Sequence, residues 1–162
     1  MLSKKMVVLG VIFTLVFLAV STLVITGIFD IEELYWMQEG HNNPIIVVSD
    51  SDYQNAPRDP YNIKNIKLNF DTLILNITYG GGCREHDFSL ITTAVFMESN
   101  PVQVNVLLSH NANNDSCLAL FTRTMAFNLS PLKEAWQEGY QKTSGTIIIH
   151  LEGLEEPIIY QF

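Results

Sequence analysis

Two cysteines and two of the four histidines are spaced so that the folded chain can bring them together. Cys83 and His86 follow the only run of three glycines, and His110 and Cys117 flank an Asn-rich stretch further along. Thiols and imidazoles in such a set can form a disulfide, hold a metal ion, or supply a nucleophile and its base. Which chemistry applies depends on the strands that position the four side chains.

Two apolar runs and a turn separate the two Cys/His pairs. The stretch Glu98–Pro101 is rich in turn-forming residues, so we expect the flanking runs to pair as an antiparallel hairpin. With Met97 opposite Val102, Cys83 falls opposite Cys117 or one place from it. Facing residues have Cα atoms about 5.5 Å apart, which suits a disulfide. We therefore expect a Cys83–Cys117 disulfide, which stabilises a domain by roughly 3 to 4 kcal/mol.

A zinc site is the alternative for the same region. Cys83, His86, His110 and Cys117 provide a Cys₂His₂ donor set, and a metal-binding or hydrolytic domain would use these four residues. The hairpin register weakens this alternative, because it separates the two histidines by about three positions along the ladder, roughly 10 Å. A Cys and a His three residues apart on one strand also face opposite sides. We therefore assign no catalytic residue and no cofactor, and we favour a protein that is not an enzyme.

The N-terminal part of the sequence predicts a membrane anchor. Residues 1–5 are short and basic, and residues 6–29 carry no charge. A helix of that length spans roughly 36 Å, more than the hydrocarbon core of about 30 Å. Lys4 and Lys5 predict a cytoplasmic N-terminus and an extracytoplasmic C-terminal domain. A signal peptide cleaved after the small residues Ala19 to Ser21 is the alternative.

The charge balance limits the partners. The chain has 17 acidic and 9 basic residues, a formal net charge of −8. Such an acidic protein is not suited to binding nucleic acid. We expect contact with the membrane through residues 6–29 and with a protein or small ligand that the sequence does not identify. If the host glycosylates exported proteins, Asn114 of Asn114-Asp115-Ser116 is the best placed acceptor.

Alternating apolar residues predict the strands that position these side chains. Short runs with a period of two recur from Ile63 to the C-terminus, and they are typical of strands with one buried face. One helix is expected from Asn128 or Ser130 to Gly139, with Pro131 in its first turn. The whole predicts an all-β fold, an antiparallel sandwich or barrel of about eight strands with one short helix, after one N-terminal transmembrane helix.

The same patterns predict a division into four segments. Residues 1–5 form a cytoplasmic stub and residues 6–29 the anchor. Residues 30–62 form a juxtamembrane stalk with a first strand and a loop that includes Ser49–Pro60, and residues 63–162 form the β-sandwich domain.

The motif Tyr-Gly-Gly-Gly-Cys-x-x-His-x-Phe from Tyr79 to Phe88, followed by His110 and by Asp-x-Cys ending at Cys117, resembles small exported or lipoprotein-like β-domains of unassigned function. The resemblance covers about residues 70–155 and implies an extracytoplasmic β-domain with these Cys and His positions as its signature. The chain departs from the lipoproteins because it has no lipobox cysteine and carries an apolar anchor. The resemblance implies no activity.

These observations favour a membrane-tethered extracytoplasmic domain with a binding or structural role in the cell envelope. Bound zinc with free thiols would favour the metal-binding or hydrolytic alternative. A further alternative is an inhibitor of exported peptidases that presents loops of the sandwich to its target.

Overall fold

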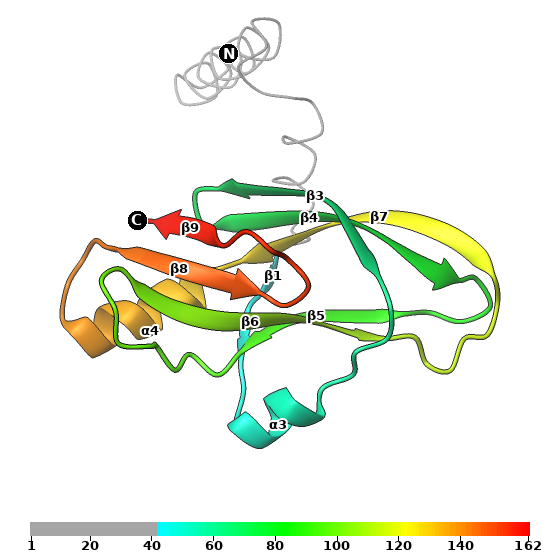
Figure 1. The fold of residues 1–162 in the computed structure, drawn as a ribbon, viewed down its shortest axis with the longest axis horizontal. Helices are drawn as coiled ribbons and strands as arrows, with labels where there is room; N and C mark the ends of the chain where they lie inside the picture. Colours follow the sequence, from blue (N-terminus) through cyan, green and yellow to red (C-terminus); the bar gives the residue numbers. More distant parts are fainter. Residues whose placement is uncertain (1–41) are drawn as a thin grey trace, which may run out of the picture. The chain divides into compact units, whose positions relative to one another are not determined.

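Two mixed β-sheets make up the part of the chain that the structure, a computed structural model, describes: residues 42–162. In chain order the elements are β1 (Asn42–Pro44), β2 (Ile46–Val47), α3 (Asp50–Asn55), β3 (Asn62–Asn69), β4 (Thr72–Gly81), β5 (Asp87–Thr92), β6 (Val102–Asn111), β7 (Ala119–Asn128), α4 (Ser130–Tyr140), β8 (Thr146–Leu151) and β9 (Ile158–Gln161). One sheet has the order β1-β7-β4-β3 and the other the order β2-β5-β6-β8-β9 (Figure 1). The mostly β fold expected from the alternating pattern is confirmed.

The expected antiparallel arrangement is wrong for part of both sheets. The pairs β1–β7, β2–β5 and β6–β8 are parallel, and the other pairs are antiparallel. Strand β7 and helix α4 lie between β6 and β8 in the chain, and they provide the long crossover that this parallel pair requires. Local alternation in the sequence carries no information on this relative direction.

The core lies between the two sheets and follows the alternation of the strands. On β4, Leu73, Leu75 and Ile77 are fully buried, and on β6 the same holds for Val104 and Val106. The residues between them face outward, as the period of two in a strand requires. These side chains belong to one apolar cluster that joins both sheets.

Residues 42–48 close one side of the sandwich. Strand β1 pairs with residues 126–128 of β7 in one sheet, and β2 pairs with Ile91 and Thr92 of β5 in the other. Ile45, between the two short strands, is only 2% exposed and belongs to the core. The single first strand expected within residues 30–62 is therefore split over two sheets. Residues 42–48 thus contribute strands to both sheets, and the four-segment division stays a prediction.

The helices are near their expected positions, with one addition. Helix α4 begins at Ser130 with proline in its first turn and buries Leu132 and Trp136, and the chain leaves it through Gln141 in the left-handed region at φ 54°. Helix α3 lies where a loop was expected. Its N-cap is Ser49, whose Oγ accepts a hydrogen bond from the backbone N–H of Asp52 at 3.2 Å.

The expected anchor over residues 6–29 lies outside the described residues. Within residues 42–162, no helix is long and apolar enough to cross a membrane.

Candidate functional site

Two loops at the end of the sandwich away from α4 carry most of the residues singled out in the sequence. The first, residues 82–86, leads from β4 in one sheet to β5 in the other. The second, residues 112–118, leads back from β6 to β7. Figure 1 shows both loops at the right-hand end of the view. Each loop passes between the sheets, so contacts between the loops also tie the sheets together.

The disulfide joins these loops. Cys83 and Cys117 are bonded, with their Cα atoms 5.9 Å apart. The register that brings them together is that of β4 and β7, where Gly81 lies opposite Ala119. Continued two residues past the end of β4 and two residues before the start of β7, the same register places Cys83 opposite Cys117. The expected proximity is correct, but it arises from another strand pair than the one used to predict it.

The hairpin register used in that prediction is off by one place. In the β5–β6 pair, Phe88 lies opposite His110, and an isolated bridge pairs Met97 with Gln103, not with Val102. Strand β5 also ends at Thr92, before the apolar run does. The register therefore shifts between the β5–β6 pair and the Met97–Gln103 bridge, in the irregular residues between Thr92 and the turn.

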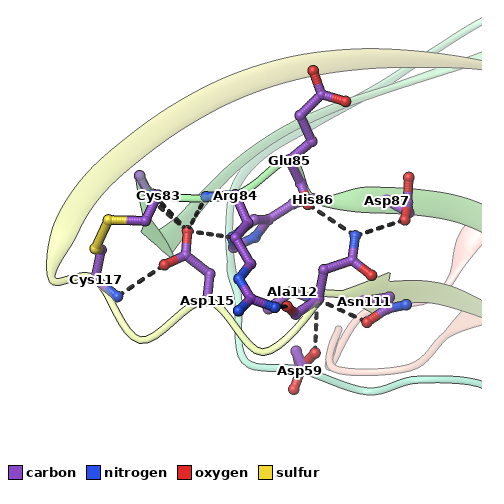
Figure 2. A network of polar contacts seen from close by, with 12 residues as sticks. Asp59, Cys83, Arg84, Glu85, His86, Asp87, Asn111, Ala112, Asp115 and Cys117 are labelled. Atoms are coloured by element: carbon purple, nitrogen blue, oxygen red, sulfur yellow. Dashed lines mark hydrogen bonds and ion pairs between the residues drawn. A yellow bond between two sulfur atoms is a disulfide. The ribbon is translucent and has the colours of Figure 1, made fainter.

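Asp115 is the centre of the polar network between the loops (Figure 2). Its Oδ2 accepts hydrogen bonds from the backbone N–H groups of Gly82, Cys83 and Arg84 at 2.8, 2.8 and 2.9 Å, and its Oδ1 accepts one from Cys117 N–H at 2.9 Å. The side chain itself is fully inaccessible to solvent. The hydrogen bond from Cys117, with those from the other loop, holds the pKa of the Asp115 carboxyl well below its usual range. Sequence reasoning did not single out this residue, although it lies in the Asp-x-Cys motif.

The turn at the end of the glycine triplet, Gly82 to Arg84, provides the backbone that Asp115 binds. Three successive N–H groups converge on one carboxylate oxygen, as in the anion-binding turns that glycine-rich segments form. Gly81 and Gly82 have φ of 154° and 122°, which side-chain-bearing residues rarely adopt. The anion in this turn is the protein's own carboxylate.

His86 and His110 are in direct contact, so the expected separation of roughly 10 Å is wrong. His86 Nδ1 lies 2.8 Å from His110 Nε2, because the loop before β5 turns His86 across the ladder. His110 Nδ1 lies 3.0 Å from the carbonyl oxygen of Asp59, and His86 Nε2 lies 3.4 Å from Asp115 Oδ2. All four ring nitrogens therefore have a partner.

The groups at the two ends of this chain, the Asp59 carbonyl and the Asp115 carboxylate, determine which histidine nitrogen donates each hydrogen bond. A carbonyl oxygen only accepts, so His110 carries a proton on Nδ1 and accepts at Nε2 from His86 Nδ1–H. His86 Nε2 faces the Asp115 carboxylate, and this contact is favourable when Nε2 is also protonated. His110 is 1% exposed, and this burial lowers its pKa, although the Asp59 carbonyl acts in the opposite direction.

The four donors of the Cys₂His₂ alternative are all bonded within the protein. The two sulfur atoms are bonded to each other, and the imidazole nitrogens hydrogen-bond to one another, to Asp59 and to Asp115. Binding zinc through this set would require reduction of the disulfide and opening of the histidine chain. The set therefore fits a structural link between the sheets better than it fits a metal ion.

Aromatic rings surround the histidine pair. Tyr79 of β4 lies with its ring centroid 5.5 Å from that of His110 and 6.0 Å from that of Phe121 on β7, its cross-strand neighbour. Phe88 of β5 stacks on His110 at 4.3 Å. The guanidinium of Arg123 lies 5.9 Å from the Phe88 ring, across the space between the sheets.

A hollow of about 670 Å³ opens beside these rings. Tyr79, Phe121 and Arg123 line it from the sheet of β4 and β7, and residues 82–87 line it from the first loop. Phe121 is 42% exposed and Arg123 is exposed, although both side chains are on the inner side of β7. The sandwich is therefore open between its sheets at this end. Asn114, the glycosylation candidate, is exposed on the second loop.

No family model matches the chain, and no curated protein matches it. Among solved structures, the fold is similar to that of a NigD-like immunity protein from Bacteroides caccae ATCC 43185, with a TM-score of 0.53 and 19% identity. The match covers 73% of this chain and 57% of that protein, so the chain spans little more than half of its length.

Two other structures from the same genus are similar at a lower level. One is a protein of unknown function from Bacteroides vulgatus ATCC 8482, with a TM-score of 0.47, 14% identity and coverage of 74% of this chain and 55% of that one. The other is described as a lipoprotein, from Bacteroides fragilis NCTC 9343, with a TM-score of 0.46, 10% identity and coverage of 75% and 69%. The comparison shows a shared fold with the NigD-like protein and leaves the Tyr79–Phe88 motif as a prediction.

Proposed function

We propose that this chain is a membrane-tethered extracytoplasmic domain that binds a partner protein at the disulfide-linked end of its β-sandwich. The observation that carries this proposal is the hollow beside Tyr79, Phe121 and Arg123. Aromatic and charged side chains line it together, and the loop on one side of it is tied to the second loop by the disulfide. Concave sites with a few placed polar groups are where proteins bind ligands and partners.

The polar network supports binding in preference to catalysis. A general base needs a nitrogen that can reach the proton it removes. In His86 and His110, each nitrogen already faces a protein atom, and Asp115 has its two oxygens filled by backbone N–H groups. These groups hold the loops in place, and a preorganised surface binds with less entropy cost.

The exposed side chains of the same end support a protein partner. Leu118 is 98% exposed and Leu120 is 76% exposed, and both lie where β7 begins, at the same end of the sandwich as the hollow. Apolar side chains that cluster on a surface with a polar rim mark sites of protein interaction. Arg84 and Arg123, together with aromatic side chains, are residue types enriched at such interfaces.

An extracytoplasmic location is supported by two independent features. The uncharged stretch 6–29 follows Lys4 and Lys5, and the disulfide suits an oxidising compartment. The fold similarity to a NigD-like immunity protein from Bacteroides caccae is compatible with a binding role, and it identifies no partner for this chain.

A site-specific cross-linker tests the proposal. A photoreactive phenylalanine analogue replaces Phe121 in the hollow, and in a matched variant it replaces Ile159 on β9, which is 62% exposed. In irradiated intact cells, we expect a protein adduct of constant mass at position 121, and we expect it to weaken when Arg123→Glu is added. Adducts of equal yield at both positions, or no adduct at position 121, would overturn the proposal.

A further inference from the structure

The outer edge of β7 is free over the first part of the strand. On its inner edge, β7 pairs with β4 along its whole length, from Ala119 to Asn128. On its outer edge β1 pairs only with residues 126–128. Within residues 42–162, no strand occupies the outer edge from Ala119 to Met125. An edge strand left open in this way is a template for pairing with another chain.

Two backbone hydrogen bonds show which residues present this edge. Ile45 N–H donates to the carbonyl of Asn128 at 2.8 Å, so the backbone groups of Asn128 point toward β1, the outer side. Leu129 N–H donates to the carbonyl of Asp71 at 2.7 Å, beside the turn between β3 and β4, the inner side. Successive residues of a strand point their N–H and C=O groups to opposite edges.

The same alternation runs back along β7 from residue 128. Leu120, Thr122 and Thr124 therefore direct their N–H and C=O groups outward, to the open edge, whereas Phe121 and Arg123 direct theirs to β4. The three outward residues together offer the donors and acceptors for one added strand. They lie directly in line with the contact that β1 already makes with the same edge.

The side chains along this edge match a particular kind of segment. Tyr79 and Phe121 offer aromatic surface in the hollow that the edge borders. Arg123 lies beside them, and within the described part of the chain it is paired with the ring of Phe88 and with no carboxylate. A segment lying along β7 would place one apolar side chain against the rings and one acidic side chain beside Arg123.

We propose that β7 binds an extended, acidic and apolar segment of a partner protein as an added β-strand along residues 119–125, next to β1. This inference rests on the proposed function, because it specifies how the partner engages that end of the sandwich. Main-chain hydrogen bonds to residues 120, 122 and 124 supply affinity, and the hollow selects the side chain, as in other cases of strand addition.

Thr122→Pro tests the added strand. Proline removes the outward N–H of residue 122, and it breaks no hydrogen bond to β4, so it is tolerated at an edge. Thr122→Val is the matched control, since it keeps the N–H and changes only the side chain. With the cross-linker at position 121 in the full-length chain, we expect Thr122→Pro to reduce the adduct by about tenfold, the effect of losing about 1.4 kcal/mol of binding, and Thr122→Val to leave it unchanged.

Folding controls and a second variant keep the test decisive. An intact disulfide and an unchanged urea midpoint show that Thr122→Pro is folded, and if it is not, Leu120→Pro removes another outward N–H closer to the strand end. An adduct that persists in a folded proline variant overturns the added strand and leaves the proposed function standing. Absence of any adduct in the parent chain overturns both.

Amide hydrogen exchange tests whether something other than a partner protein covers the outer edge of β7. We expect the amides of Leu120, Thr122 and Thr124 to exchange freely in the purified full-length chain in detergent and to become protected with the partner bound. Protection already present in the purified monomer means that the chain covers its own edge, and protection that depends on chain concentration means a second copy. Either result overturns the proposal.

Discussion

His86 Nδ1 lies 2.8 Å from His110 Nε2, and this hydrogen bond connects the loop between β4 and β5 to strand β6 of the five-stranded sheet. His110 continues the chain to the Asp59 carbonyl, and His86 continues it to Asp115, which holds the disulfide loop. A polar chain therefore runs from the start of β3 to the cross-linked end. Its members are buried, so the removal of one member leaves another without a partner.

His86→Ala should destabilise the domain by about 1 to 3 kcal/mol, because it leaves the buried Nε2 of His110 unsatisfied. His150→Ala is the matched control. His150 is half-buried and its Nε2–H donates one hydrogen bond to Gln103 Oε1, so its loss should cost less. Urea denaturation at neutral pH measures both values. Equal losses for the two variants would show that the histidine pair has no special role in stability.

Stability should fall as the pH falls below about 6.5, the ordinary pKa of histidine. Burial lowers the pKa of His110 in the folded chain, so the unfolded chain binds more protons in this range and acid favours unfolding. Asp115 acts in the same direction at lower pH. Its pKa is lowered by the Cys117 and loop hydrogen bonds, so its stabilisation is present above about pH 4 and is lost as the pH falls toward the folded pKa.

His110→Asn separates the two effects. The variant should have a flatter dependence of the free energy of unfolding on pH between about 6.5 and 5, while the loss below about pH 4 remains. The measurement is urea denaturation at a series of pH values. A slope that His110→Asn leaves unchanged between pH 6.5 and 5 would show that other groups determine it.

Gly81→Ala should destabilise the domain although Gly80→Ala should not. A Cβ on Gly81 would lie 2.5 Å from His86 Nε2 and 3.1 Å from Asp115 Oδ2, and φ is 154° there. The nearest atom to a Cβ on Gly80 is the Ala119 carbonyl oxygen, at an ordinary 4.0 Å. We expect a loss of about 1 to 3 kcal/mol for Gly81→Ala and a change within about 1 kcal/mol for Gly80→Ala. Thermal unfolding of both variants, with the parent as reference, gives the comparison.

The sequence predicted the strands well because each strand has one buried face. Alternation identified β3, β4, β6 and β8, and the proline and glycine signals identified α4. The direction of β8 relative to β6 was not predictable, since it depends on a crossover whose path is set by packing. The division of residues 42–47 over two sheets was missed for the same reason, because a run of β-branched residues looks alike in one strand or two.

The geometry of the candidate site could not be predicted from the register of the β5–β6 hairpin alone. Cys83 and Cys117 were expected to be neighbours through the β5–β6 hairpin, and they are neighbours through the β4–β7 pair. The contact between His86 and His110 was missed because the loop before β5 leaves the ladder and crosses to the other sheet. Asp115 was missed because its role depends on three backbone N–H groups that no sequence pattern specifies.

The topology predicted for residues 1–29 can be measured directly. If the uncharged stretch is a retained anchor, the protein stays in the membrane fraction after a carbonate wash and its mature N-terminus is near Met1. Protease added to intact cells should degrade the domain, because Lys4 and Lys5 predict a cytoplasmic N-terminus. A soluble protein that begins near Thr22 would indicate a cleaved signal peptide, and full protection until lysis would indicate the opposite orientation.

The disulfide should contribute more stability than any single hydrogen bond of the network. Cys83→Ala and Cys117→Ala should each lower the free energy of unfolding by about 2 to 5 kcal/mol, the usual cost of losing a native disulfide. The double variant should be little worse than either single variant, because all three lose the same bond. The measurement is urea denaturation of the oxidised parent and the three variants, with Ser116→Ala, an exposed neighbour on the same loop, as the control.

Thiol chemistry and metal content decide between the disulfide and the zinc alternative. The intact mass of the purified parent should be two hydrogens below that of the reduced chain, and thiol reagents should label it only after reduction. Asp115 accepts hydrogen bonds from the backbone N–H groups of both cysteines. Reduction of the disulfide should therefore also loosen the loops and increase amide exchange at Cys83 and Arg84. Free thiols together with one zinc per chain, and unfolding by a chelator, would replace the structural role of Cys83 and Cys117 with metal binding.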